Sequence, residues 1–407
     1  MKKDPNPSVG VAPADAPAAV PRRRFGRTGL RLPVLSAGFM RAMQSWQDVA
    51  DEQIDPNSQR TMLAVAREAL RLGIDHFETA RGYGSSERQL GRVLEEVGRD
   101  RVILQTKVQP CADPEQFSAA VRDSLRRLRV GRVDLLALHG VNDHRALWHA
   151  CRPGGCLAAA RRLQARGLVG WIGFSGHGPT GVLLDAVRHR GDGGFDYVNL
   201  HWYAIFRRHT AVLEQAAARD LGVFIISPTD KGGRLHHPPP LLGRLCAPLS
   251  PMQFNDLVCL LRPEVTTISV GASRPSDFHE HRAALARLDQ PDLVAAIDRR
   301  WQAAMCAATG QQRPDDHWPE WPSFADLPGY INVACIFWLE NLVRGWDLGA
   351  YARARYALLG RENAWVPGNS AAHADDWDWT EIARDTGLTA TELVERLRRA
   401  HALLRTD

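Results

Sequence analysis

The chain has 407 residues, with 51 basic and 46 acidic side chains and a formal net charge of +5. This length can bury a substantial core and leaves room for one large domain and a smaller one. Acidic residues are interleaved with the arginines, so the mild charge does not favour nucleic-acid binding, and no apolar run is long enough to predict a membrane span. The seven cysteines lack C-x-x-C spacing and are expected to be reduced thiols in the cytoplasm.

Residues 1–21 are rich in proline, alanine and glycine and show no apolar periodicity. This composition predicts a disordered N-terminal leader. Two lysines stand at its start, but no continuous apolar segment follows, so the leader is not typical of a secretory signal. We therefore expect a cytoplasmic protein whose folded part begins near residue 22.

From about residue 22 to 290, short aliphatic runs alternate with longer amphipathic stretches. Strands are expected within residues 32–39, 74–80, 102–108, 133–140, 170–176, 195–203, 223–230 and 266–273. Between them, segments such as 58–73 and 113–130 carry apolar residues at helical spacing. Eight such units predict a (β/α)8 TIM barrel, an α/β fold. A doubly wound open sheet is the alternative, but no glycine fingerprint follows the first strand.

Most of the predicted strands begin apolar and end in a polar side chain. These side chains are Glu78, Lys107, His139, Ser175, Asn199 and Ser227. Barrel enzymes build their sites at the carboxyl ends of the strands, so residues at successive strand ends are expected to converge.

Lysine is rare in this chain, which has only Lys2, Lys3, Lys107 and Lys231. Drift towards arginine would replace a lysine that is merely a solvated charge, but not one that acts as a compact, titratable ammonium. Lys107 closes the apolar run V-I-L-Q-T-K-V instead of lying on a helix surface. We therefore predict a functional role for it.

Glu78, Lys107 and His139 end successive predicted strands, and Tyr83 follows Glu78 in its loop. A phenol beside an ammonium can donate a proton to a carbonyl oxygen, while the carboxylate holds the lysine and the imidazole orients the carbonyl. No side chain supplies a hydride, so carbonyl reduction at this site requires a nicotinamide cofactor.

Two segments carry a family resemblance. R-R-F-G-R-T-G-L-R-L-P-V-L-S-A-G and G-I-D-H-F-E-T-A-R-G-Y-G-S-S-E-R-Q-L-G resemble the opening hairpin, first strand and tyrosine signature of the aldo-keto reductase family. The resemblance covers roughly residues 22–290, the expected barrel. It implies that Tyr83 is the proton donor, Lys107 its pKa modifier and His139 the residue that orients the substrate.

The same resemblance implies a cofactor site. Ser175 and Asn199 would contact the nicotinamide amide, and Arg274 would bind a 2′-phosphate, which favours NADPH. The cofactor phosphates would lie near the two loops that contain Ser227, Lys231, Gly271 and Ser273.

The chain departs from the family pattern at three positions. Glu78 stands where the family has aspartate, and His281 where relatives often have asparagine near the adenine. Ile226 precedes Ser227 where many relatives stack a tyrosine on the nicotinamide, so the aromatic face is expected either to be missing or to come from elsewhere, with Trp202 and Tyr203 as the candidates.

Residues 291–407 break the strand–helix rhythm and are rich in tryptophan. They resemble the ferredoxin-type extension of one aldo-keto reductase branch, and we expect a small, mainly helical extension. Only Cys306 and Cys335 lie in this region, so no iron–sulfur cluster is expected. The tryptophans are expected to fill the apolar core, with direct contact to the substrate as the alternative role. His317, beside two aspartates, is expected in a solvated loop with no metal.

The leading hypothesis is an NADPH-dependent oxidoreductase that reduces a small-molecule aldehyde or ketone. The alternative is a nicotinamide-binding pseudoenzyme or partner subunit in which Glu78 has cost activity. An isomerase or dehydratase without nicotinamide would leave Ser175 and Asn199 unexplained. The sequence identifies no protein partner.

Overall fold

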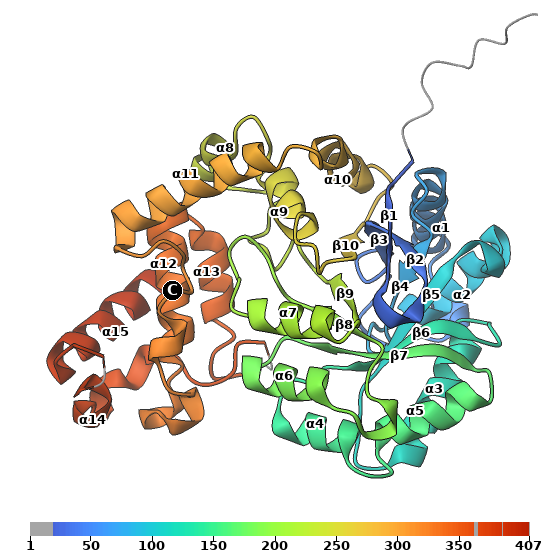
Figure 1. Ribbon diagram of the computed structural model, residues 1–407, viewed down its shortest axis with the longest axis horizontal. Coiled ribbons are helices and arrows are strands. Elements are labelled where there is room, and N and C mark those ends of the chain that lie inside the picture. Colours follow the sequence, from blue (N-terminus) through green and yellow to red (C-terminus); the bar gives the residue numbers. More distant parts are fainter. Residues whose placement is uncertain (1–18, 362–364, 385, 407) are drawn as a thin grey trace, which may run out of the picture.

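The computed structural model describes residues 19–361, 365–384 and 386–406, so most of the predicted leader lies outside the described residues. Parallel strands close into a barrel in the order β10, then β3 to β9, with helices outside it (Figure 1). The predicted (β/α)8 fold is confirmed. The barrel strands are β3 Leu35–Gly38, β4 His76–Glu78, β5 Ile103–Val108, β6 Val133–His139, β7 Val169–Gly176, β8 Tyr197–Leu200, β9 Gly222–Ile225 and β10 Thr267–Gly271.

The outer helices begin where the sequence provides caps. Asp55 accepts a hydrogen bond from the Ser58 amide at 3.0 Å ahead of α1, and Asp113 caps α3 through the Glu115 amide at 2.9 Å. The helices around the barrel are α1 Pro56–Arg71, α2 Ser86–Val97, α3 Pro114–Arg127, α4 His144–Cys151, α5 Cys156–Ala165, α6 Thr180–Arg188, α7 Thr210–Ala218, α8 Pro240–Cys246, α9 Pro251–Leu260 and α10 Asp277–Ala284.

The strand that was expected within residues 223–230 is shorter than the prediction. β9 ends at Ile225, so Ser227 lies beyond its strand. Ser227 has φ +56°, a left-handed backbone conformation that cannot continue a β-strand.

Side chains fill the barrel interior in layers. At the amino-terminal end, Leu135, Tyr197 and Phe224 form an apolar cluster with Phe25. Phe25 lies between β1 Arg22–Arg24 and β2 Arg31–Pro33, which pair as an antiparallel hairpin. The next layer is polar: Ser36 Oγ hydrogen-bonds to His76 Nδ1 at 2.6 Å and to Thr267 Oγ1 at 2.7 Å. Glu78 and Lys107 lie beyond this layer, at the carboxyl ends of β4 and β5.

The C-terminal part is helical and packs beside the barrel, on the left of Figure 1. Its helices are α11 Pro291–Thr309, α12 Val333–Trp346, α13 Gly349–Tyr356, α14 Thr380–Arg384 and α15 Ala390–Leu404. Within the described residues, no helix combines the length and apolarity that a membrane crossing needs.

The tryptophans of this extension have two kinds of environment. Trp301, Trp338, Trp346 and Trp379 are fully buried, which confirms their predicted core role. Trp377 is 49% exposed, so the prediction is wrong for that residue. Others, described below, line a cavity against the barrel.

The extension is fixed to the rim loops by specific hydrogen bonds. Trp338 Nε1 donates to the Ile205 carbonyl at 3.0 Å, and the Tyr351 hydroxyl donates to the Lys231 carbonyl at 2.6 Å. These contacts join α12 and α13 to the loops after β8 and β9. The extension therefore forms one wall of the space above the barrel.

Candidate active site

Glu78 and Lys107 form a buried ion pair at the barrel rim. Lys107 is 1% exposed, and its ammonium donates to the Glu78 carboxylate and, at 2.9 Å, to the Thr79 carbonyl. The second oxygen of Glu78 accepts a hydrogen bond from Ser269 Oγ at 2.9 Å. The carboxylate is thus held from two sides and anchors the ammonium.

The neighbouring strand leaves room for the longer glutamate arm. A Cβ atom at Gly38 would lie 2.8 Å from both the Glu78 Oε1 and the Ser269 Oγ atoms. Any larger residue at position 38 would displace the carboxylate.

Tyr83 lies between Lys107 and His139. The Lys107 ammonium is 4.9 Å from the centroid of the Tyr83 ring, and the His139 ring meets that ring edge-on at 5.6 Å. Burial raises the pKa of Tyr83, and the Lys107 charge opposes this increase only in part. Burial alone would lower the pKa of Lys107, but Glu78 and Tyr83 outweigh it, so the pKa lies above its ordinary value. Lys107 is therefore protonated and Tyr83 protonated at neutral pH.

His139 faces the phenol in its neutral form. Burial, followed by the positive charges of Lys107 and Lys231, lowers the pKa of His139 to about 3. A neutral imidazole can donate one hydrogen bond to a carbonyl oxygen without competing with Tyr83 as an acid.

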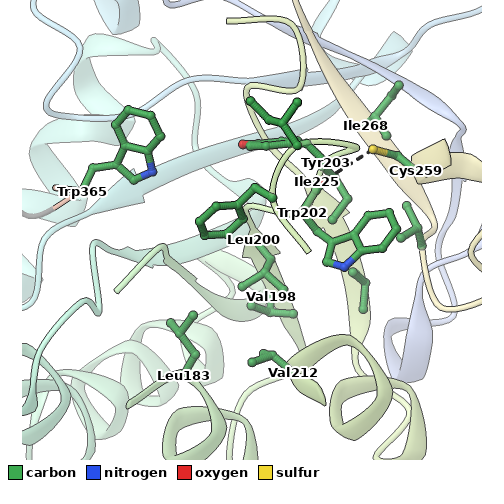
Figure 2. Close-up of a cluster of buried hydrophobic side chains, with 14 of the residues drawn as sticks. Leu183, Val198, Leu200, Trp202, Tyr203, Val212, Ile225, Cys259, Ile268 and Trp365 are labelled. Atoms are coloured by element: carbon green, nitrogen blue, oxygen red, sulfur yellow. Dashed lines mark hydrogen bonds between the residues drawn. The ribbon is translucent and has the colours of Figure 1, made fainter. Parts of the chain in front are cut away.

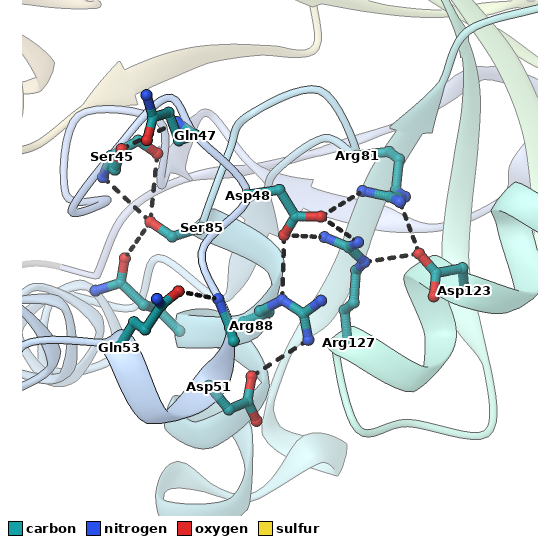
Figure 3. Close-up of polar contacts among 12 residues, drawn as sticks. Ser45, Gln47, Asp48, Asp51, Gln53, Arg81, Ser85, Arg88, Asp123 and Arg127 are labelled. Atoms are coloured by element: carbon teal, nitrogen blue, oxygen red, sulfur yellow. Dashed lines mark hydrogen bonds and ion pairs between the residues drawn. The ribbon is translucent and has the colours of Figure 1, made fainter.

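A network of ion pairs holds the loop that carries Tyr83 (Figure 3). Arg81 contacts Asp123 at 2.7 Å and Asp48 at 3.7 Å. Asp48 also pairs with Arg127 and, at 3.1 Å, with Arg88. The hydrogen bond from Arg127 is the main reason that the pKa of Asp48 falls to about 2. The network joins the loops after β3 and β4 to α2 and α3, which fixes the backbone near Tyr83.

Two adjoining cavities are lined by some of the residues predicted to bind the cofactor, but not by Ser175 or Asn199. The smaller, of about 40 Å³, is bounded by Glu78, Tyr83 and Ser227, and the larger, of about 280 Å³, by Ser273 and Arg274. Both have Arg41, Thr229 and Gly271 in their walls. The path formed by these cavities runs from Tyr83 along the ends of β9 and β10.

Ser175 and Asn199 are strand neighbours in register, and Ser175 is the strand neighbour of His139. Asn199 is completely buried, yet neither its amide nitrogen nor its amide oxygen has a hydrogen-bond partner among the described residues. Buried amides are normally satisfied. These atoms therefore fit a polar ligand such as a nicotinamide amide, although the Ser175 hydroxyl already accepts from the Gly140 amide at 3.1 Å.

Lys231, predicted from the sequence near the cofactor phosphates, lies outside the walls of these two cavities. Its ammonium is 3.4 Å from His201 Nε2 and 5.0 Å from the centroid of the Trp365 ring. Asp230, the adjacent carboxylate, pairs with Arg355 at 3.0 Å. Burial, with a contribution from Arg355, lowers the pKa of Lys231 to about 7.

The lowered pKa of Lys231 predicts a pH-dependent stability. The unfolded chain binds this proton more tightly, so between about pH 7 and the unfolded pKa of roughly 10.4, stability rises with pH. Below about pH 7, Lys231 is protonated in both the folded and the unfolded state, so the buried ammonium destabilises the folded state to its full extent. We expect Lys231→Met to stabilise the protein most near about pH 6, with a gain that shrinks by about pH 10. Urea unfolding of both proteins across this range measures it, and a gain independent of pH would contradict the prediction.

The structure corrects the expected source of an aromatic face. Trp202 and Tyr203 are buried among aliphatic side chains of the barrel (Figure 2). The Trp202 indole donates to Thr210 Oγ1 at 3.0 Å, and the Tyr203 hydroxyl donates to the Ile226 carbonyl. Ile226 itself lines the cavity beside Tyr83.

Three rim residues were missed by the sequence analysis. Ser269 orients Glu78, and His177 and His201 stack on each other at 4.9 Å. The signal was present: His177 and His201 lie just beyond the ends of β7 and β8, two residues after Ser175 and Asn199, so the convergence expected for the strand ends includes them.

The expected lack of an iron–sulfur cluster and of a metal rests on the side chains present. In the extension, Cys306 is exposed on α11 and Cys335 is buried on α12. His317 is buried, which contradicts the solvated loop predicted for it, and its Nε2 bonds to the Ala334 carbonyl at 3.0 Å. Within the described parts of the chain, no three His, Cys, Asp or Glu side chains form a group suited to a metal.

The chain is a (β/α)8 barrel with a carboxylate, a lysine and a histidine at the ends of three successive strands and a tyrosine in the loop after the first of them. A family model described as the aldo/keto reductase family matches residues 34–237, and the chain belongs to that family.

Individual curated relatives have low sequence identity to this chain. L-glyceraldehyde 3-phosphate reductase of Escherichia coli is 31% identical over 158 residues, which are 33% of this chain and 43% of that protein. The match thus spans less than half of that relative. L-galactose dehydrogenase of Arabidopsis thaliana is 25% identical over 294 residues, 66% of this chain and 88% of that protein.

The fold is also seen in solved structures. The holo form of an aldo-keto reductase from Bacillus halodurans superposes with a TM-score of 0.55 at 20% identity, covering 68% of this chain and 95% of that one. At this identity the likeness supports the barrel fold alone.

Proposed function

We propose that the protein is an NADPH-dependent reductase of aldehydes or ketones. One observation carries the proposal: Tyr83 is held between Lys107 and His139 in the wall of a cavity that continues along β9 and β10. The names of the two relatives, a reductase of an aldehyde and a dehydrogenase of a sugar, agree with carbonyl chemistry.

Each rim residue has one part in the proposed reaction. Tyr83 donates a proton from its hydroxyl to the carbonyl oxygen, and His139 orients that oxygen through a hydrogen bond. Lys107 stabilises the phenolate that Tyr83 becomes, and Glu78 keeps the ammonium in place. The nicotinamide, when bound, supplies the hydride. The unpartnered Asn199 amide would hold the nicotinamide.

The wall of the larger cavity favours NADPH over NADH. Arg274 lies at its edge with a side chain that is 76% exposed and bonded to Asp277 at 2.8 Å, and Arg41 and His236 also line it. A guanidinium can bind a 2′-phosphate with two hydrogen bonds. Asp277 would hold Arg274 in position, since it also accepts from the Ser273 amide at 2.9 Å.

We expect Arg274→Ala to weaken NADPH binding by about 10-fold and to leave NADH binding nearly unchanged, because hydrogen bonds to a charged group contribute about 1.5–3 kcal/mol and solvent screens this one. Fluorescence titration with each nucleotide measures both affinities. Arg282→Ala, which removes a charge from α10, the helix that follows the loop of Arg274, is the control. Equal losses for the two nucleotides would contradict the assignment of Arg274.

The proposed function is tested by titrating the purified protein with NADPH and then following its oxidation with a panel of aldehydes and ketones. Saturable binding and oxidation that requires a carbonyl would support it. Binding without oxidation of NADPH by any carbonyl would favour the pseudoenzyme alternative. Absence of nucleotide binding would exclude both.

The Glu78→Asp variant distinguishes an active enzyme whose site accommodates glutamate from a pseudoenzyme in which Glu78 has reduced the activity. Glu78 already reaches both Lys107 and Ser269, and aspartate would withdraw the carboxylate by about 1.5 Å, one carbon–carbon bond. We therefore expect Glu78→Asp to lower kcat, by up to about 100-fold for a displacement of this size. An increase in kcat in this variant would support the decayed alternative instead.

A further inference from the structure

A separate cavity, distinct from the two beside Tyr83 and Arg274, lies between the barrel and the C-terminal extension. It has a volume of about 190 Å³. Its wall includes His177 and Arg208 from the barrel side and Trp318, Trp321 and Trp365 from the extension. His177 follows the end of β7, two residues after Ser175, the strand neighbour of His139. The cavity therefore adjoins the place where the carbonyl would be reduced.

Arg208 is the unusual residue of this wall. Its guanidinium lies between two aromatic rings, 4.5 Å from the Phe206 centroid and 3.8 Å from the Trp318 centroid. Among the described residues no carboxylate or carbonyl hydrogen-bonds to it, and its buried Nε has no partner. The residue as a whole is half-buried, but a buried polar atom without a partner is costly, and proteins normally satisfy such atoms.

The neighbouring arginines show how such a charge is otherwise compensated. Arg207, next in the chain, pairs with Asp298 at 2.7 Å. Asp315 lies close enough to attract Arg208 electrostatically, but its carboxylate accepts the Arg207 amide at 2.7 Å. Arg208 is thus held in place by aromatic stacking, with its polar edge left free for a ligand.

Hydrogen-bond donors and positive charge lie in and next to this wall: His177 lines the cavity, whereas His201 and Lys231 do not line it but are joined to His177 by contacts. His177 and His201 are stacked with an angle of 16° between their planes, and the Nδ1 atom of each is buried without a partner. Lys231 contacts His201, and the carboxylate beside it, Asp230, pairs with Arg355. The neutral imidazoles can donate to an oxyanion, while Lys231 and Arg208 make the local potential positive.

We propose that this cavity binds the anionic end of the carbonyl substrate, a carboxylate or a phosphate, through Arg208 with His177 beside it. This proposal rests on the proposed carbonyl reduction and names its substrate class. A guanidinium presents two parallel N–H donors that match either oxyanion, and the aromatic rings keep its plane fixed. Arg208 is a specificity residue here and takes no part in proton or hydride transfer.

The first experiment compares matched pairs of substrates. Succinic semialdehyde is compared with butanal, and glyceraldehyde 3-phosphate with glyceraldehyde, by kcat/KM. The wild type is expected to have the higher kcat/KM for the anionic member of at least one pair. A preference in the first pair indicates a carboxylate site, and a preference in the second pair indicates a phosphate site. Arg208→Gln is expected to lower kcat/KM for that anionic substrate by about 10–100-fold and to change the neutral one less than about twofold, because charged hydrogen bonds contribute about 1.5–3 kcal/mol.

Two further variants make the result specific. Arg208→Lys keeps the charge but loses the planar pair of donors, so an intermediate loss of kcat/KM for the anionic substrate is expected. If Arg208→Gln does not fold, Arg208→Lys is the variant that tests the proposal. Arg262→Gln is the matched control, because Arg262 also lies over a tryptophan, at 5.7 Å from Trp202, but pairs with Glu264 at 2.8 Å. It should leave the preference unchanged. Equal losses for charged and neutral substrates in the Arg208 variants would overturn the proposal.

A binding measurement separates this proposal from the proposed function. Succinate and glycerol 3-phosphate are titrated calorimetrically into the wild type and Arg208→Gln, with no turnover involved. Binding by the wild type that is lost in Arg208→Gln supports the oxyanion site. If the wild type also reduces no carbonyl, the proposed function is wrong while the oxyanion site stands. Reduction of neutral carbonyls with no preference for anionic substrates and no oxyanion binding overturns the site alone.

Discussion

Replacing Tyr83 by phenylalanine is expected to lower kcat by about 10²–10⁴-fold, the range typical for loss of a general acid. The phenylalanine ring keeps the contacts with Lys107 and His139, so only the hydroxyl is removed. Because the hydroxyl acts on the carbonyl and not on the nucleotide, the affinity for NADPH should remain within about a factor of two.

Steady-state kinetics and nucleotide fluorescence measure the two quantities in the same preparation. Tyr330→Phe is a suitable control, since Tyr330 is 62% exposed in the extension. Turnover near the wild-type rate in Tyr83→Phe would remove this tyrosine from the mechanism.

Lys107→Met is expected to destabilise the protein by about 3–5 kcal/mol, the cost of leaving a buried charge without its partner. Glu78 would keep a carboxylate at the rim with only the Ser269 hydroxyl bonded to it. The variant should also lose activity, because the phenolate of Tyr83 would have no neighbouring cation.

The double variant Lys107→Met with Glu78→Gln removes both charges and is expected to be more stable than Lys107→Met alone. Unfolding in urea of the wild type, both single variants and the double variant gives the coupling between them. Strictly additive changes would contradict the buried ion pair. Lys231→Met provides the comparison, since that lysine lacks a carboxylate contact among the described residues.

The sequence predicts the barrel and the site around Tyr83 because both follow from short-range rules. Aliphatic runs mark the strands, and in a parallel barrel the strand ends meet, which brings together residues as far apart in the chain as Glu78 and His139. The family resemblance then supplied a role for each group. No equivalent rule positions Arg208, because it lies in a loop after β8 and its aromatic neighbour Trp318 comes from the extension. Loop conformation and docking of the extension depend on long-range packing, which has no period in the sequence.

The hairpin of β1 and β2 bears on the order in which the chain can fold. The ring centroids of Phe25 and Tyr197 are 5.2 Å apart, and a side chain at Gly222 would collide with the Phe25 ring. Arg24 bonds to Asp220, 196 residues later. The hairpin has one partner early in the chain, since Arg22 pairs with Asp75 at 2.8 Å, but the contacts of Phe25 and Arg24 with Tyr197 and Asp220 require most of the barrel to be synthesised first. Because such distant contacts form late and slowly, the amino-terminal end of the barrel, which Phe25 closes, is expected to pack among the last events of folding.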